Sequence, residues 1–409
     1  KWAKAAAACK DVMELNVYKL YTTGINTVNT GAFPATIAPP HHDVYSNEDF
    51  PNGWANIDPY ESYRALFNGT VSSVDNPELI FTRGQNIGGE RIKDMVIHQL
   101  PSVAKGWNTH GMTQKQVDAY YMNTGDDCPG MNSQYAGYQA YKDRVDNRPR
   151  PVGYTSNAQD YKPLSANVSL QYANREPRFY ASVAFNGARW YLGNESQQAN
   201  QNKQVFYYRG GGNGYSNNMF WLRTGIGVMK YVNPSDTYEN SDGAKIIDKD
   251  EPAIRYADIL LMYAEASLEA GDKPTAIEYL DMVRTRGDNM PSINDTYPQG
   301  ITENQLREII RRDRRIELAF EDKRWWDILR WKICDGENGV MNKPIGGMKI
   351  EDTNGDGVWE YNYHEVGKRT FLPRMYYQPI PQYVIDKNPV IREQNGGEDG
   401  WVNGQNPGY

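Results

Sequence analysis

The stretch from residue 251 to residue 331 limits the choice of fold more than any other part of the chain. Two apolar faces with helical spacing flank the Gly271-Asp272 break: Leu260, Tyr263 and Ala264 before it, and Ala276, Leu280 and Val283 after it. The small side chains of Ala264 and Ala276 would let two antiparallel helices approach closely. This pattern predicts a helical hairpin of tetratricopeptide type.

A densely charged helix is expected next. Thr302 can cap its first turn while Gln305 reaches back in a capping box. An apolar stripe with arginines around it follows: Leu306, Ile309, Ile310, Ile316 and Phe320, with Arg311, Arg312, Arg314 and Arg315. The arginines could indicate a phosphate-binding face. Because Glu308, Asp313, Glu317 and Glu321 lie at helical pairing distance, the favoured interpretation is internal ion pairing.

Composition narrows the possible partners. A net charge of −7 and a pI near 5.4 argue against nucleic acid, since a polyanion needs a basic face. No run of about twenty apolar residues occurs, so no segment is predicted to span a bilayer. Cys9, Cys128 and Cys334 are odd in number and widely spaced, which supports neither a disulfide framework nor a zinc site.

Tyrosine and tryptophan are unusually frequent. The chain has 30 Tyr and 10 Trp against 10 Phe, and its mean hydropathy is −0.76. These rings combine a flat apolar face with a hydrogen-bonding edge, which suits amphipathic ligands such as sugars. Most of the rings are nevertheless expected to pack within the structure.

The glycine-rich segment 83–112 holds the first candidate site for a sugar. Trp107 lies beside Asn108, with Arg91 and His110 nearby, and few apolar neighbours accompany it. Loops on a rigid scaffold commonly carry binding residues. Trp54, Trp190 and Trp221 are further candidates for stacking on a sugar, with anchoring of the core as the alternative for each.

A calcium site is a second possibility. Asp352, Asn354 and Asp356 alternate as in the first half of an EF-hand loop, and Gly357 follows. Tyr363 replaces the bidentate glutamate that such a loop needs. Because the flanking residues resemble strands, a hairpin turn without metal is the alternative interpretation.

Signatures of an enzyme are missing from the sequence. It contains no GxSxG elbow, no HExxH and no P-loop. A glycosidase would need two carboxylates across a cleft, and sequence spacing alone cannot exclude such a pair.

The fold class expected is mainly α, with a helical-repeat scaffold and a long loop-rich insertion that carries short strands. Helices are predicted over 1–21, 59–66 and 113–121, and strands over 79–82, 179–183, 205–209 and 229–232 and around Trp190. The whole chain, 1–409, is expected to form one domain. Within it we expect a loop-rich, ligand-facing region over 22–250, the hairpin and arginine-rich helix over 251–335, and an irregular region over 336–409.

Several segments together resemble the SusD/RagB-like family of surface glycan-binding lipoproteins. They are NPELIFTR (76–83), TQKQVDAYYMNTG (113–125), EPRFYASV (176–183), the RYADILLMYAEA hairpin followed by RRDRRIELAFEDKRWWDILRW, YYQPIPQYVIDKNP (376–389) and the terminal QNPGY. The resemblance implies a protein on the extracellular face of the outer membrane. Such a protein binds an oligosaccharide or polysaccharide and passes it to a TonB-dependent, SusC-like transporter.

The first residues depart from that family pattern. Residues 1–21 resemble an internal helix, so we expect the signal peptide, the lipid-bearing cysteine and the first repeats to be absent from this chain. The resemblance implies binding without catalysis and no required cofactor. A glycoside hydrolase and a helical scaffold that binds only protein partners are the alternatives.

Overall fold

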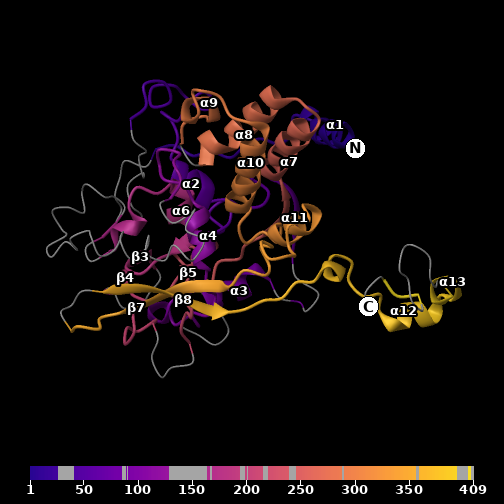
Figure 1. The fold of residues 1–409 in the computed structure, drawn as a ribbon. Helices are drawn as coiled ribbons and strands as arrows, with labels where there is room; N and C mark the ends of the chain where they lie inside the picture. Colours follow the sequence, from indigo (N-terminus) through magenta and orange to yellow (C-terminus); the bar gives the residue numbers. More distant parts are fainter. Residues whose placement is uncertain are drawn as a thin grey trace. The chain divides into compact units, whose positions relative to one another are not determined.

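The chain divides into two compact units. A computed structural model describes residues 1–25, 41–84, 89, 91–128, 164–165, 168–193, 199, 201–214, 220–238, 246–287, 290–355, 359–393 and 404–406 (Figure 1). The larger unit comprises 1–321 and 346–364, and the smaller one comprises 322–345 and 365–409.

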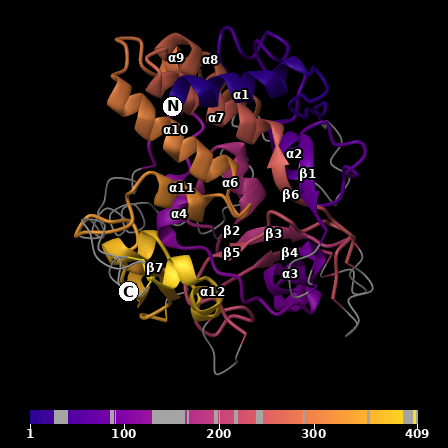
Figure 2. The same ribbon diagram turned by 90° about the vertical axis from the view of Figure 1, so that its right-hand side faces the viewer.

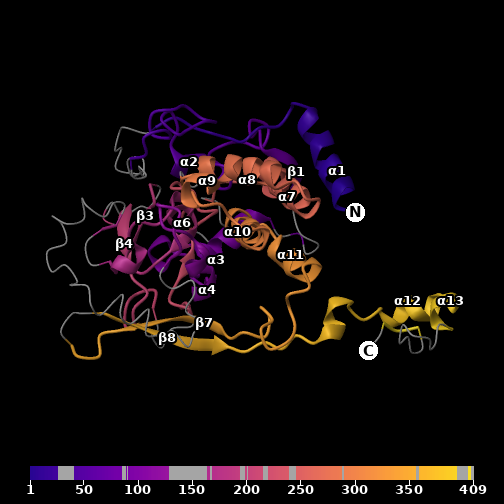
Figure 3. The same cartoon turned by 45° about the horizontal axis from the view of Figure 1, so that its top comes forward.

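Packed helices form one layer of the larger unit. They are α1 (Trp2–Glu14), α7 (Tyr256–Glu269), α8 (Lys273–Gly287), α9 (Ile293–Thr296) and α10 (Glu303–Glu317). Gly271 has φ +91°, a left-handed conformation that glycine adopts without strain, and it separates α7 from α8. Ala264 and Ala276 are fully buried where these two helices meet, so the predicted hairpin is present. Helix α10 packs against both helices (Figure 3).

The N-terminal helix completes this layer. Helix α1 packs along α7, as Figure 2 shows. It ends at Glu14, earlier than the predicted residue 21, and Asn16, two residues further on, has a left-handed φ of 55°. The capping box predicted at the start of α10 is confirmed, since Thr302 accepts from the Gln305 amide and the Gln305 side chain bonds back.

Shorter elements build the rest of the larger unit. The helices are α2 (Pro59–Arg64), α3 (Ile92–Gln99), α4 (Gln114–Ala119) and α6 (Pro177–Ser182), with 3-10 turns η1 (Ser102–Ala104) and η2 (Leu170–Tyr172). The strands are β1 (Leu79–Arg83), β2 (Val183–Ala184), β3 (Ala188–Tyr191), β4 (Asn202–Val205), β5 (Gly227–Val228), β6 (Glu251–Arg255), β7 (Ile345–Glu351) and β8 (Glu360–Gly367). The described architecture is therefore predominantly helical with short strands, as expected.

The strands pair two by two. The sheets are β1–β6, β2–β5, β3–β4 and β7–β8. In the first sheet Leu79 lies opposite Arg255 and Arg83 opposite Glu251, in antiparallel register. Strand β6 thus places Arg255 at the start of α7 and directs it into the core, where it is 1% exposed.

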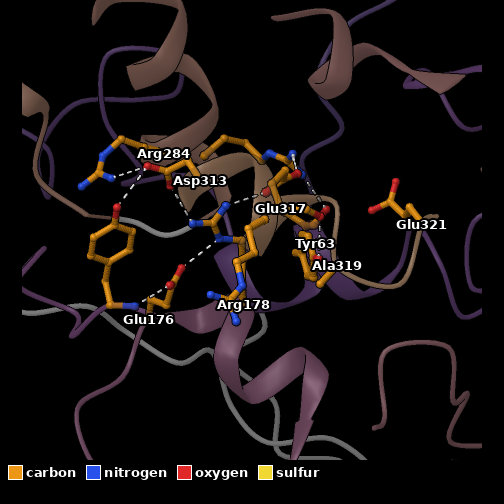
Figure 4. Close-up of polar contacts among 12 residues, drawn as sticks. Tyr63, Glu176, Arg178, Arg284, Asp313, Glu317, Ala319 and Glu321 are labelled. Atoms are coloured by element: carbon orange, nitrogen blue, oxygen red, sulfur yellow. Dashed lines mark hydrogen bonds and ion pairs between the residues drawn. The ribbon is translucent and has the colours of Figure 1, made fainter. Parts of the chain in front are cut away.

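A balanced network of buried charges lies in this core. Five basic side chains face five acidic ones: Arg178, Lys230, Arg255, Arg284 and Arg286 face Glu78, Glu176, Asp313, Glu317 and Glu321. In Figure 4, Arg178 reaches Glu176, Asp313 and Glu317 at 2.8, 3.2 and 2.8 Å. Because each isolated buried ion would cost several kcal/mol, pairing among these groups is a condition for folding.

The charges of α10 are paired in a different way from that expected. Arg311 pairs with Glu308 of the same helix at 3.0 Å. Arg314 pairs with Asp258 of α7 at 2.9 Å, and Arg315 donates to Gln116 of α4. Ion pairing within the helix is confirmed for Arg311, whereas the described ion pairs of Arg312 and Arg314 are made with Asp127 and Asp258 of other segments. Helical spacing could not reveal neighbours that other elements supply.

Two further predictions are corrected. Residues 179–183 were expected to form a strand, yet Phe179 to Ser182 belong to α6, which begins with Pro177 at its first turn, where the fixed φ of proline favours a helix. The segment 83–111 was expected to be part of the loop-rich region, yet it contains α3, where the Arg91 backbone amide donates to the Asp94 carboxylate at 2.8 Å.

The smaller unit has its own core. It contains α11 (Arg324–Arg330), η4 (Pro373–Tyr376), α12 (Gln382–Lys387) and α13 (Pro389–Arg392). Ile328, Cys334 and Phe371 are its buried centre. All three cysteines of the chain are buried. Within the described residues, no helix is both long and apolar enough to cross a membrane.

Candidate functional site

Trp107 lies at the surface in a group of rings. It is 39% exposed, and its ring runs nearly parallel to that of Phe220, with 6.3 Å between centroids and 22° between planes. Tyr238 meets Trp107 edge-on at 6.4 Å, and His98 does so at 4.8 Å. His110 stacks on His98 at 4.9 Å. We call these five residues the Trp107 cluster.

The backbone fixes the position of Trp107 against α3. The Trp107 amide donates to the Ile97 carbonyl at 2.8 Å, and the amides of Thr109 and His110 donate to the His98 carbonyl at 2.9 and 3.0 Å. Gly106 presses against Leu100 so closely that a Cβ there would overlap the Leu100 carbonyl. The loop therefore folds back on the helix, and the indole remains at the surface.

Asn108 holds the loop from its other side. It is buried, has a left-handed φ of 48°, and its side-chain amide donates to the Asn213 carbonyl at 2.9 Å. The Asn213 side chain in turn accepts from the Ser102 amide at 2.7 Å. Asn108 therefore acts as a positioning residue, and its buried side chain offers little to a ligand at the surface.

The two histidines give the cluster polar edges. His98 Nδ1 shares a hydrogen bond of 2.7 Å with the Thr109 hydroxyl. Burial, and then the neighbouring His98, lower the pKa of His110, so this ring is neutral at pH 7. Flat apolar faces and hydrogen-bonding ring edges thus lie side by side, an arrangement that can hold an amphipathic ligand.

Arg91 lies at the opposite end of α3. It is the N-cap residue, and its guanidinium is 3.4 Å from Asp248. At a rise of about 1.5 Å per residue, the helix separates Arg91 from His98 by roughly 10 Å. The structure therefore does not bring Arg91 into contact with the cluster, although sequence proximity suggested that it would.

The other predicted tryptophans occupy different environments. Trp54 is 5% exposed and stacks on Tyr45 at 5.1 Å. Trp190 is 2% exposed and lies on β3 in the main core. Neither offers an exposed face for stacking, so the alternative of core anchoring fits both. Trp221 is half-buried and follows Phe220 of the cluster directly.

Sequence reasoning missed two rings of the cluster. Phe220 is 43% exposed and Tyr238 is half-buried, and both are more than one hundred residues from Trp107 in sequence. The one local signal was the Gly- and Asn-rich stretch before Phe220, which is typical of a surface loop.

The proposed calcium ligands lie in the connection between β7 and β8. Strand β7 ends at Glu351 and β8 begins at Glu360, so the strand-like flanks are confirmed. Asn354 donates to Glu360 at 3.2 Å, Asp352 is partly buried, and Asp356 lies outside the described residues. Within the described part of the chain, no group of three or more His, Cys, Asp or Glu side chains is arranged to hold a metal.

Comparison with known proteins identifies the family. The family model of the SusD family matches residues 77–401. "SusD-like protein P2" and "SusD-like protein P38" of Formosa agariphila are each 39% identical to this chain, over 100 and 92 residues. Each of these matches covers 22% of this chain, and they cover 19% and 18% of the two relatives.

Solved structures share the fold. A SusD-like protein of Bacteroides fragilis NCTC 9343 superimposes with a TM-score of 0.65 and 21% identity, over 100% of this chain and 62% of its own. A SusD-like carbohydrate binding protein of the same strain superimposes with a TM-score of 0.56 and 23% sequence identity. The match covers 95% of this chain and 61% of that protein. This chain thus spans less than two thirds of the length of these proteins. Since the family model covers most of its residues, the chain belongs to the SusD family.

Proposed function

We propose that this protein binds glycans at its surface and that the Trp107 cluster is the stacking platform. The observation that carries the proposal is the exposed Trp107 ring, held nearly parallel to Phe220 and bordered by two histidine rings. Membership of the SusD family supports it, as does a structural relative whose title describes it as carbohydrate binding.

The binding mechanism follows from the chemistry of the sugar. The C–H-rich face of a pyranose would lie on the indole, while its hydroxyls would exchange hydrogen bonds with the imidazole nitrogens. No bond of the sugar is broken in this mechanism. A glycoside hydrolase would require two carboxylates on either side of the scissile bond. Three buried carboxylates of the larger unit, those of Glu78, Asp313 and Glu317, are instead engaged by guanidinium groups.

The cellular setting is inferred from the family resemblance. We infer an extracellular position at the outer membrane, attachment through a lipidated cysteine, and transfer of the glycan to a TonB-dependent, SusC-like transporter. We also interpret the α7–α8 hairpin as a tetratricopeptide-like repeat, since small buried alanines mediate the close approach of its helices. A scaffold that binds only proteins is the second candidate function.

A polysaccharide panel tests the proposal. Immobilised starch, xylan, mannan, pectin and mucin glycans would be incubated with the purified protein, and both retention and released sugars would be measured. We expect retention on at least one glycan without release of shorter sugars. Sustained release would indicate a hydrolase, whereas failure to bind every glycan, together with capture of a transporter segment, would favour the scaffold.

A further inference from the structure

A second pair of aromatic side chains lies at the loop end of the β7–β8 hairpin. Trp359, directly before β8, stacks face to face on Tyr208, with 3.6 Å between centroids and 15° between planes. Both rings are half-buried and pack at the margin of the main core. A backbone hydrogen bond of 2.8 Å from Arg209 to the Ile350 carbonyl fixes the Tyr208 segment to β7. Each ring has one face against the other and keeps part of its surface in solvent.

Charged side chains accompany this pair. Arg209 and Lys349 share the carboxylate of Glu351, at 3.1 and 2.9 Å. Their side chains are 59% and 48% exposed, while that of Glu351 is 12% exposed. The guanidinium and ammonium groups are thus oriented by the carboxylate and still reach solvent, where they can donate hydrogen bonds to hydroxyl groups.

One loop joins this pair to the Trp107 cluster. The segment from Tyr208 to Asn213 is turned by bonds from the Gly211 amide to the Tyr208 carbonyl and from the Gly214 amide to the Gly211 carbonyl. Its far end, Asn213, is the residue that bonds Asn108 and Ser102 beside Trp107. Five residues span at most about 18 Å even when fully extended. The two aromatic groups are therefore held at a limited separation by a short, hydrogen-bonded connection.

We propose that Tyr208 and Trp359, with Arg209 and Lys349, form a second sugar subsite, so that the protein selects oligosaccharide chains of several units over short ones. This inference rests on the glycan-binding function proposed for the Trp107 cluster. Two linked contacts made by one ligand increase affinity because the second contact forms at a high effective concentration. Short sugars can occupy only one subsite and lack this gain.

Calorimetry with oligosaccharides of two and six units tests the subsite. Malto-, xylo-, manno- and galacturono-oligosaccharides would serve as the probes. The wild type should bind one hexasaccharide at least tenfold more tightly than the matching disaccharide. Trp359→Ala should weaken binding of the hexasaccharide about tenfold and leave the disaccharide unchanged. Trp107→Ala should weaken both, and Trp326→Ala, which removes an exposed tryptophan outside both groups, should change neither.

Two sets of results would contradict these proposals. Hexasaccharide affinity unchanged in Trp359→Ala, or an equal loss for both lengths, overturns the second subsite while leaving the Trp107 platform intact. Failure of every probe to bind the wild type overturns the proposed function and this inference with it. If Trp359→Ala does not fold, Arg209→Ala replaces it, because an exposed pair contributes little stability. It should show the same selective loss for the hexasaccharide.

Discussion

Removing the Glu317 carboxylate should destabilise this protein far more than removing an exposed carboxylate of the same helix. Glu317 is fully buried and lies 2.8 Å from Arg178, 2.8 Å from Arg255 and 3.0 Å from Arg286. In Glu317→Ala these three guanidiniums would share one negative charge fewer, and the five-against-five balance of the network would be lost. Breaking a buried pair from one side costs on the order of 3–5 kcal/mol.

Glu308→Ala is the matched control. Glu308 is on the same helix and its side chain is 71% exposed, with one partner, Arg311, at 3.0 Å. Such an exposed pair is worth less than about 1 kcal/mol. Denaturant unfolding of both variants at pH 7 gives the comparison. Equal losses of unfolding free energy in the two variants would refute the role assigned to the network.

The effect should also depend on pH. Burial alone would raise the pKa of Glu317, but Arg255, Arg286 and Arg178 outweigh it and hold the pKa well below the usual 4.5. The stabilisation is therefore present above pH 4.5 and is lost as the pH falls below that value toward the folded-state pKa. The gap between Glu317→Ala and the wild type should shrink in acid. Glycan affinity should not change, and a selective loss of binding at unchanged stability would place α10 in the site.

Two other perturbations test separate parts of the structure. Burial raises the pKa of Asp281 to about 7, although Arg284 opposes the shift. The folded protein therefore loses stability as the pH rises from about 4 through 7, because the buried carboxyl group must then ionise. Asp281→Asn keeps an acceptor for the Ile293 amide and should raise the melting temperature at pH 8 but not at pH 4; the same change at both values would contradict this. If calcium binds at 352–356, chelation should lower the melting temperature and added calcium should restore it. An unchanged melting curve in the presence of chelator would indicate a hairpin loop without calcium.

Local patterns predicted the α7–α8 hairpin and the start of α10. The capping box at Thr302, the break at Gly271 and the small alanines of the α7–α8 hairpin are all short-range features, and all are present. The strand predicted over 179–183 was wrong because Pro177 sets the first turn of a helix there. In that helix Arg178 is directed into the ion network, a tertiary partner that no local pattern encodes.

The candidate site was predictable only in part. The scarcity of apolar neighbours around Trp107 correctly indicated an exposed ring. Phe220 and Tyr238 come from distant segments, and their contacts with Trp107 depend on how the loops cross. The burial of Trp54 and Trp190 was not predictable in the same way, because both have polar neighbours in the sequence and are nevertheless buried. A ring's exposure depends on its neighbours in space, which for these residues are non-local.

Titration of Trp107→Ala with the glycan that the panel identifies is the most direct test of the proposed platform. We predict that binding weakens at least tenfold, which corresponds to about 1.4 kcal/mol, within the range of roughly 1–3 kcal/mol expected for a stacking contact. The melting temperature should stay close to that of the wild type, because the ring is 39% exposed. Full affinity in Trp107→Ala, measured by calorimetry on folded protein, would contradict the claim that this cluster binds the glycan.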